Sequence, residues 1–166
     1  MILPSQIIRA MCLIGKRPLI TPFHERSKSN GRTFGLSGAG YDVRIAETIW
    51  VWPLFGRLAS TIERFDLPND IVAEVKDKST NARKFITVQN TVAEPGWHGY
   101  LTLEITRHLP WPARIAAGTP IAQIMFKQLA APTDQPYVGR YQNQQAGPQA
   151  AKLIPNEGRP GWWGQW

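Results

Sequence analysis

VKDKSTNARKFITVQNTVAEPGWHGYLTLE, residues 75–104, combines strand-like segments with two polar clusters. The first cluster is KSTNAR (78–83), and the second begins with EPGW (94–97) and leads to Glu104. Between them, FITVQ (85–89) alternates apolar and polar residues, as half-buried strands do. Cations, hydroxyls and two carboxylates on a stiff β scaffold would suit a phosphorylated small molecule and a proton-transfer reaction.

The alternation continues on both sides of this stretch. It predicts further strands at residues 41–45, 60–65, 71–76, 100–106 and 121–129. IWVW (49–52) is entirely apolar and predicts a strand buried on both faces. Many short strands separated by turn residues indicate an all-β sandwich, jelly roll or barrel.

The two ends of the chain differ from this β pattern. Residues 1–15 predict a short helix capped by Ser5, and the polar, glycine-containing residues 24–38 predict a loop. Residues 137–152 are rich in Gln, Asn and Gly, and the end of the chain, GRPGWWGQW, contains three tryptophans. Because exposed tryptophan is costly in water, we expect this tail to dock on a neighbouring surface.

Length and composition indicate one globular domain. The chain has 166 residues, of which 43% are hydrophobic and 19% charged. No apolar run is long enough for a membrane span and the N-terminus lacks a signal-peptide pattern, so we expect a cytoplasmic protein without a membrane partner. The net charge of +7 suits an anionic partner, although a plain basic surface is equally compatible with it.

Cysteine and histidine usage restricts the metal chemistry. Cys12 is the only cysteine, which rules out an intrachain disulfide and a four-cysteine zinc site. The three histidines show no HExxH spacing, and the PCxxC signature of zinc deaminases is absent. Any deamination would therefore proceed without zinc.

Glu104 is the first candidate for chemistry. In YLTLEIT the residues Tyr100, Thr102, Glu104 and Thr106 share one strand face, opposite an apolar stripe. An exposed strand carboxylate is the simple alternative. Its Tyr and Thr neighbours and the rigid strand favour a catalytic acid or base.

Two other segments could hold phosphate. Lys78, Ser79, Thr80 and Arg83 supply the cations, hydroxyls and backbone amides that bind phosphate oxygens. A solvated basic turn is the alternative. Residues 137–144 place an arginine beside amide side chains in a loop and leave the same two possibilities.

Taken together, these segments resemble the dCTP deaminase family, within the wider dUTPase-like superfamily. The resemblance covers residues 1–154 as one domain, and the Trp-rich tail, residues 155–166, has no counterpart. The matching segments, in family order, are MILPSQIIRAM…LITPF (1–23), LSGAGYDVRI (36–45), VKDKSTNAR (75–83), EPGWHGYLTLE (94–104), GTPIAQIMF (118–126) and PYVGRYQNQ (136–144).

The resemblance implies a distorted jelly-roll or β-clip fold that assembles as a homotrimer with active sites between subunits. It implies zinc-independent hydrolysis of dCTP to dUTP and ammonia, with Mg²⁺ bound through the triphosphate. No protein side chain is expected to be a dedicated metal ligand.

The resemblance also assigns roles to individual residues. Glu104 falls on the glutamate that acts on the attacking water, with Ser79 and Arg83 as its catalytic support. The expected substrate-binding residues are Lys78 and Thr80 for phosphate, Glu94 on the sugar side, Thr102 and Leu103 through their backbone to the base, and Tyr137, Arg140 and Gln144 over the triphosphate.

The sequence is also compatible with other functions. A dUTP diphosphatase, or a bifunctional enzyme that performs both reactions, would use Glu94 to activate water at the α-phosphate. A nucleotide-binding regulatory protein without turnover is the alternative from another class. Nucleic acid is an unlikely partner on sequence grounds, because only the terminal tryptophans resemble an aromatic and basic face.

Overall fold

Alternating burial along the long strands builds a mainly β structure. The computed structural model describes residues 1–152. Its elements are α1 (Ser5–Leu13), β1 (Ile20–Thr21), β2 (Ser27–Ser29), β3 (Arg32–Ser37), β4 (Gly40–Arg44), β5 (Ile49–Val51), β6 (Arg57–Asp66), β7 (Ile71–Asp77), α2 (Ser79–Ala82), β8 (Ile86–Val88), β9 (Val92–Ala93), β10 (His98–Arg107), β11 (Ala113–Ile115) and β12 (Pro120–Gln128). The predicted all-β class with one short N-terminal helix is confirmed.

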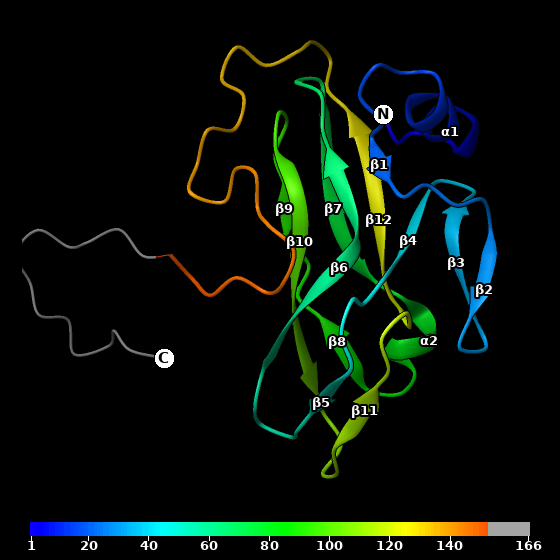
Figure 1. The fold of residues 1–166 in the computed structure, drawn as a ribbon, viewed down its shortest axis with the longest axis vertical. Helices are drawn as coiled ribbons and strands as arrows, with labels where there is room; N and C mark the ends of the chain where they lie inside the picture. The colour runs from blue at the N-terminus through cyan, green and yellow to red at the C-terminus, as the bar shows by residue number, and fades with distance from the viewer. Residues whose placement is uncertain (153–166) are drawn as a thin grey trace, which may run out of the picture.

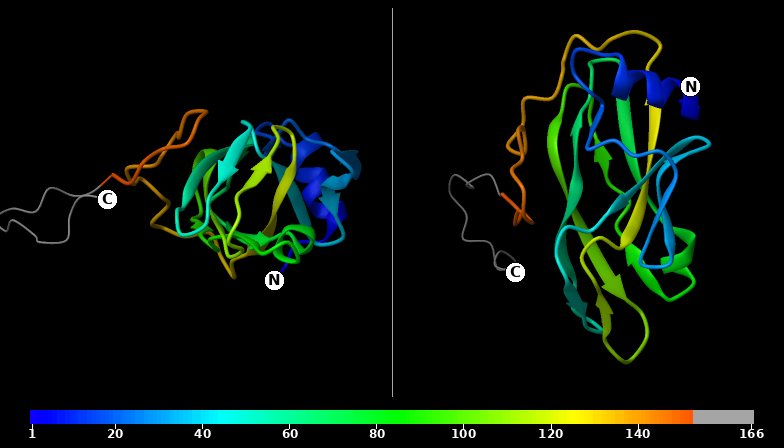
Figure 2. Two further views of the ribbon diagram at one scale, coloured as in Figure 1. Left: turned by 90° about the horizontal axis from the view of Figure 1, so that it is seen from below. Right: turned by 45° about the vertical axis from the view of Figure 1, so that its right-hand side comes forward.

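The strands form two main sheets and a small ribbon. One sheet has the order β2-β3-β4-β12-β7-β9, the second β1-β6-β10-β8, and the ribbon is β11-β5. Viewed from below, the strands surround a central core (Figure 2). Its largest fully buried side chains include Tyr41, Phe65, Leu103 and Phe126. This core holds β10, the strand that carries Glu104, firmly between β6 and β8.

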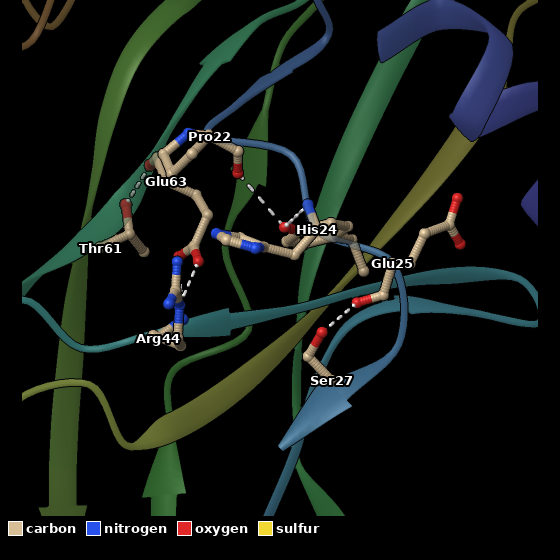
Figure 3. A network of polar contacts seen from close by, with 8 residues as sticks. Pro22, His24, Glu25, Ser27, Arg44, Thr61 and Glu63 are labelled. Atoms are coloured by element: carbon tan, nitrogen blue, oxygen red, sulfur yellow. Dashed lines mark hydrogen bonds and ion pairs between the residues drawn. The ribbon is translucent and has the colours of Figure 1, made fainter. Parts of the chain in front are cut away.

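A buried ion pair joins the two main sheets. Arg44 on β4 donates from Nε to Glu63 on β6 at 2.8 Å, and its backbone N–H donates to the other carboxylate oxygen at 2.9 Å. Glu63 is fully buried, and the Arg44 guanidinium also lies 4.2 Å from the centre of the Phe34 ring. Figure 3 shows this pair beside Thr61, whose hydroxyl accepts the Leu101 N–H of β10 at 3.0 Å. The pair thus fixes β6, on which β10 rests.

Three local predictions are wrong. Within the predicted loop at 24–38, residues 27–37 form the β2–β3 hairpin, because Asn30 and Gly31 adopt the positive φ angles of 49° and 71° that a tight hairpin turn requires. Trp50 and Trp52 are exposed because β5 pairs only with β11 in a ribbon that is covered on one face. The residue that precedes α1 is Pro4, so Ser5 is not its cap.

The C-terminal arm, which we define as residues 136–152, runs beside β9 and β10 (Figure 1). It is anchored by hydrogen bonds to the 94–102 region, described below, and Tyr137 packs against the core. In the described part of the chain, no helix combines the length and apolar character needed to cross a membrane. The Trp-rich tail lies outside the described residues.

Candidate active site

Strand β10 presents Glu104 as its sequence predicts. Leu101, Leu103 and Ile105 are buried, while Thr102 and Glu104 point to the other face. Glu104 Oε2 is itself buried and has no hydrogen-bond partner within the described residues. Burial raises the pKa of the Glu104 carboxyl above its ordinary value of 4.5. A half-buried carboxylate with an unused oxygen is suited to exchanging protons with a bound water or ligand.

Glu104 lies in a cleft of about 810 Å³ between β10, the segment that leads into it, and the C-terminal arm. This volume falls within the usual range for small-molecule sites. Five of the predicted site residues meet there: Glu94, Thr102, Glu104, Tyr137 and Gln144. The structure therefore brings together three sequence segments that the chain keeps far apart.

The arm contacts β10 directly at Thr102. Gln144 Nε2 donates to Thr102 Oγ1 at 2.6 Å, and the Gln149 N–H donates to the same oxygen at 3.0 Å. The Tyr100 N–H donates to Gln144 O at 3.0 Å, and Gly99 leaves room for this close approach. A Cβ on Gly99 would lie 2.6 Å from Gln144 N. The fit between β10 and the arm thus defines one wall of the cleft.

One backbone edge of β10 is available inside this cleft. The Tyr100 N–H bonds the arm, and Glu104 O accepts the Gln89 N–H at 2.9 Å, so even-numbered residues direct their backbone groups away from β6. Because backbone direction alternates along a strand, Thr102 directs its backbone groups to the same edge. Leu103 faces β6 instead, and its side chain is buried in the core. Only Thr102 of this pair offers backbone groups toward the cleft.

Two arm anchors were not singled out in the sequence. Trp97 Nε1 donates to Tyr141 O at 2.8 Å. Gln142 Nε2 donates to Gly96 O at 2.8 Å and to Tyr137 O at 2.9 Å, and its Oε1 accepts the His98 N–H at 3.0 Å. Within the run QNQQ no local signal distinguishes Gln142 from its neighbours. Its role depends on pairing with a turn more than 40 residues away.

The predicted phosphate segment lies elsewhere on the subunit. Ser79, Thr80 and Arg83 are exposed on and beside α2, and none of them lines the Glu104 cleft. Asn81 fixes this short helix, since its amide donates to Pro120 O and Ile121 O of β12, both at 3.0 Å. Within a single subunit, the Ser79 and Arg83 side chains are therefore separated from Glu104.

Lys78 differs from its exposed neighbours. It is buried, and its ammonium group pairs with the Asp42 carboxylate of β4. This partner comes from the YDVR segment, 36 residues away in sequence. The Lys78–Asp42 ion pair thus holds the start of α2 against β4.

The remaining predicted residues occupy the rim or the arm. Glu94 is exposed and lines the cleft. Arg140 is exposed on the arm, where its guanidinium donates to Lys152 O, and it does not line the cleft. Over residues 1–152, no group of three or more His, Cys, Asp or Glu side chains is arranged to hold a metal ion.

Comparison with known proteins agrees with this geometry. A family model described as dCTP deaminase-like matches residues 43–129. Proteins named dCTP deaminase from Acidobacterium capsulatum and Gluconobacter oxydans are each 34% identical to the chain. The alignments cover 83% and 86% of this chain and 92% and 94% of the relatives.

Solved structures share the fold at lower identity. The 2'-deoxycytidine 5'-triphosphate deaminase of Agrobacterium tumefaciens superposes with a TM-score of 0.62 at 17% identity, covering 76% of this chain and 48% of that one. A mutant dUTPase from Staphylococcus aureus phage phi11, described with a structural Mg(II) ion, gives 0.54 at 16% identity, with 75% and 96% covered. The fold is thus dUTPase-like, and the chain belongs to the dCTP deaminase-like family.

Proposed function

We propose that this protein hydrolyses dCTP to dUTP and ammonia, with Glu104 as the group that moves protons. The unpartnered, buried Glu104 Oε2 in a nucleotide-sized cleft is the observation that carries this proposal. The membership of the dCTP deaminase-like family supports the same reaction.

The reaction needs a proton acceptor first and a proton donor later. Glu104 accepts a proton from water as the water oxygen bonds to C4 of the cytosine ring. The protonated Glu104 passes this proton to ring N3. Glu104 then takes the proton of the new C4 hydroxyl and delivers it to the exocyclic nitrogen, the C4–N bond breaks, ammonia leaves, and C4 keeps the oxygen as the carbonyl of dUTP. A pKa raised above the ordinary 4.5 suits both halves, because it makes the Glu104 carboxylate a stronger proton acceptor than an exposed glutamate. Such a group contributes roughly 10²–10⁴ in rate.

The nucleotide would be held by β10 and the arm. The Thr102 backbone edge faces the base, with Leu103 beside it, and Glu94 lies on the sugar side. Tyr137, Arg140 and Gln144 close over the triphosphate, which requires Arg140 to turn from Lys152 toward the cleft. Mg²⁺ would be held mainly by the phosphate oxygens, as is usual for this ion when few carboxylates are present.

Catalytic support would come from a neighbouring subunit. Ser79 and Arg83 lie outside the cleft of their own subunit but are exposed, so a homotrimer with heterologous contacts can bring them to the next Glu104. Arg83 would then stabilise developing charge, and Thr80 would contact phosphate. Lys78 would contact phosphate only after its ammonium group separates from the Asp42 carboxylate. We place the enzyme in the cytoplasm, acting without zinc.

The direct test is product analysis. Wild-type protein is incubated with Mg²⁺ and either dCTP or dUTP, and nucleotides, ammonia and pyrophosphate are measured. The proposal expects dUTP and ammonia from dCTP. Pyrophosphate release from dUTP would instead assign a diphosphatase, or a bifunctional enzyme if both reactions occur. Unchanged nucleotides with measurable binding would favour a regulatory nucleotide-binding protein.

The shared site has its own test, which mixes subunits of two inactive variants. Arg83→Ala and Glu104→Gln each lose activity alone, and refolding an equal mixture restores a complete site wherever an intact Glu104 meets an intact Arg83. Random assembly predicts about a quarter of the wild-type sites. No recovery in trimers of verified mixed composition would contradict a site shared between subunits.

A further inference from the structure

The ribbon of β5 and β11 lies at the end of the molecule remote from α1 (Figure 1), and exposed aromatic and basic side chains gather on and beside it. We call this surface the ribbon surface, made by Trp50, Trp52, Phe55, Arg57, Trp111 and Arg114. Its four aromatic side chains are 52–72% exposed. Aromatic side chains exposed to this degree and gathered in one place indicate a binding surface rather than isolated surface residues.

The β5–β11 ribbon explains why these residues face outward. Ile49, Val51 and Ile115 are buried on its inner face, so the residues between them point to solvent. The strand register places Trp50 directly opposite Arg114. An indole and a guanidinium therefore lie side by side on the outer face.

The surface continues over three adjoining hollows. Phe55 lines two of them, one shared with Trp50, Trp52 and Arg57 and the other with residues 106–110. Arg107 and Leu109 line this second hollow and also a third, which extends along residues 111–116. Because neighbouring hollows share lining residues, the three form a continuous track, which we call the track below.

The charge along this track is of one sign. Among residues 1–152, no aspartate or glutamate lines any of the three hollows. Arg57, Lys84 and Arg114 form no ion pair within the described chain. The carboxylate closest along the chain to β5, that of Glu47, accepts the Ser60 N–H at 2.9 Å. The cations of the track are consequently available to an anionic partner.

Aromatic rings interleaved with arginines and free of carboxylates are suited to single-stranded nucleic acid. Bases stack on indole and phenyl faces, while guanidinium groups bind the phosphates between them. Pairing this surface with the same surface of a second copy would oppose arginines with no carboxylate to neutralise them, which disfavours a symmetric dimer through it. From the sequence alone, only the terminal tryptophans resemble an aromatic and basic face, whereas the structure shows a second one on the ribbon surface.

We propose that the ribbon surface binds single-stranded nucleic acid, with bases stacked on Trp50, Trp52 and Phe55 and phosphates on Arg57 and Arg114. None of these five residues lines the Glu104 cleft, and Arg83, which is proposed above to support catalysis in a neighbouring subunit, lines only the third hollow.

Fluorescence anisotropy with labelled oligo(dT) and oligo(U) of about 15 nucleotides, a length that spans an ordinary single-strand site, tests the proposal. Trp50→Ala and Trp52→Ala should each weaken binding roughly ten-fold. Arg57→Gln and Arg114→Gln should each reduce the slope of log affinity against log salt concentration by about 0.7. A preference for one sugar would show whether DNA or RNA is bound, and a duplex should bind more weakly than either single strand.

Two controls keep this outcome distinct from others. A Trp162→Ala, Trp163→Ala, Trp166→Ala variant should bind like wild type, and loss confined to this variant would move the binding to the tail. Excess dCTP should not displace the oligonucleotide, and displacement would mean that the oligonucleotide occupies the nucleotide cleft.

The Trp50→Ala, Trp52→Ala double variant should keep its assembly mass and any deaminase activity. Loss of the assembly would identify a subunit interface, and absence of salt-dependent binding to wild type would refute the proposal.

Discussion

Gln142→Ala should detach the C-terminal arm from the Glu104 cleft. The substitution removes the bonds from Gln142 Nε2 to Gly96 O and Tyr137 O, and those from the backbone N–H groups of His98 and Asn143 to Oε1. These contacts are partly solvated, so each contributes near the lower end of the usual range, about 0.5 kcal/mol. Only the bonds that involve Gly96 O and the His98 N–H join the arm to the rest of the chain, and together these two amount to about 1 kcal/mol, or roughly five-fold in the docked population of the arm.

The smaller docked population of the arm should lower the apparent affinity for dCTP. Because substrate must first recover the docked arm, KM for dCTP should rise roughly five-fold when docking becomes limiting, while kcat at saturation changes less. Steady-state kinetics gives both constants, and hydrogen exchange of residues 136–152 reports the docking itself. Overall unfolding should stay near the wild-type temperature, because the arm lies outside the main sheets.

Gln145→Ala is the matched control. Gln145 is exposed, and its amide only donates to Asn143 O at 2.9 Å within the arm. It should leave both KM and arm exchange unchanged. If Gln142→Ala accelerates exchange in the arm but KM stays within about twofold, below the roughly five-fold effect of losing about 1 kcal/mol, the arm is not part of the substrate site.

Burial and close contact give four further predictions. Burial raises the pKa of Glu104, so kcat/KM should fall with decreasing pH through a value above 4.5; a limb at or below 4.5 would contradict the environment described. The same raised pKa means that the charged form destabilises the fold above that pKa, so Glu104→Gln should raise Tm at neutral pH, a gain that disappears in acid. Gly99→Ala would bring a Cβ to 2.6 Å from Gln144 N and should raise KM without lowering Tm greatly, whereas unchanged kinetics would show that the arm adjusts freely. Glu63→Gln leaves Arg44 without its buried partner and should cost about 3 kcal/mol in urea unfolding, and a change below about 1 kcal/mol would show that the pair is not structural.

Much of strand β10 could be predicted from local sequence. Side-chain alternation in YLTLEIT determines which face of β10 carries Glu104, and the observed burial confirms it. The hairpin at 27–37 was also encoded locally, since Asn30-Gly31 is a tight-turn signal, but the surrounding polar residues obscured it.

The remaining features depend on contacts between distant segments. The exposure of Trp50 and Trp52 follows from a two-stranded ribbon with one covered face, and their apolar character alone suggested burial. The sequence predicts Lys78 as a phosphate ligand because the hydroxyls and the cation that follow it are suited to phosphate oxygens. Its burial against Asp42 follows from the packing of α2 on β4. The docking expected of the Trp-rich tail stays a prediction, because residues 155–166 lie outside the described structure.

The most direct test of the central claim is deamination of dCTP by Glu104→Gln. The amide keeps the shape of the side chain but cannot accept the proton from water, so the rate should fall by roughly 10²–10⁴ while calorimetric binding of dCTP persists. Glu74→Gln, which changes a carboxylate of β7 outside the cleft, should retain wild-type activity. Ammonia release from Glu104→Gln at the wild-type rate would contradict Glu104 as the proton carrier.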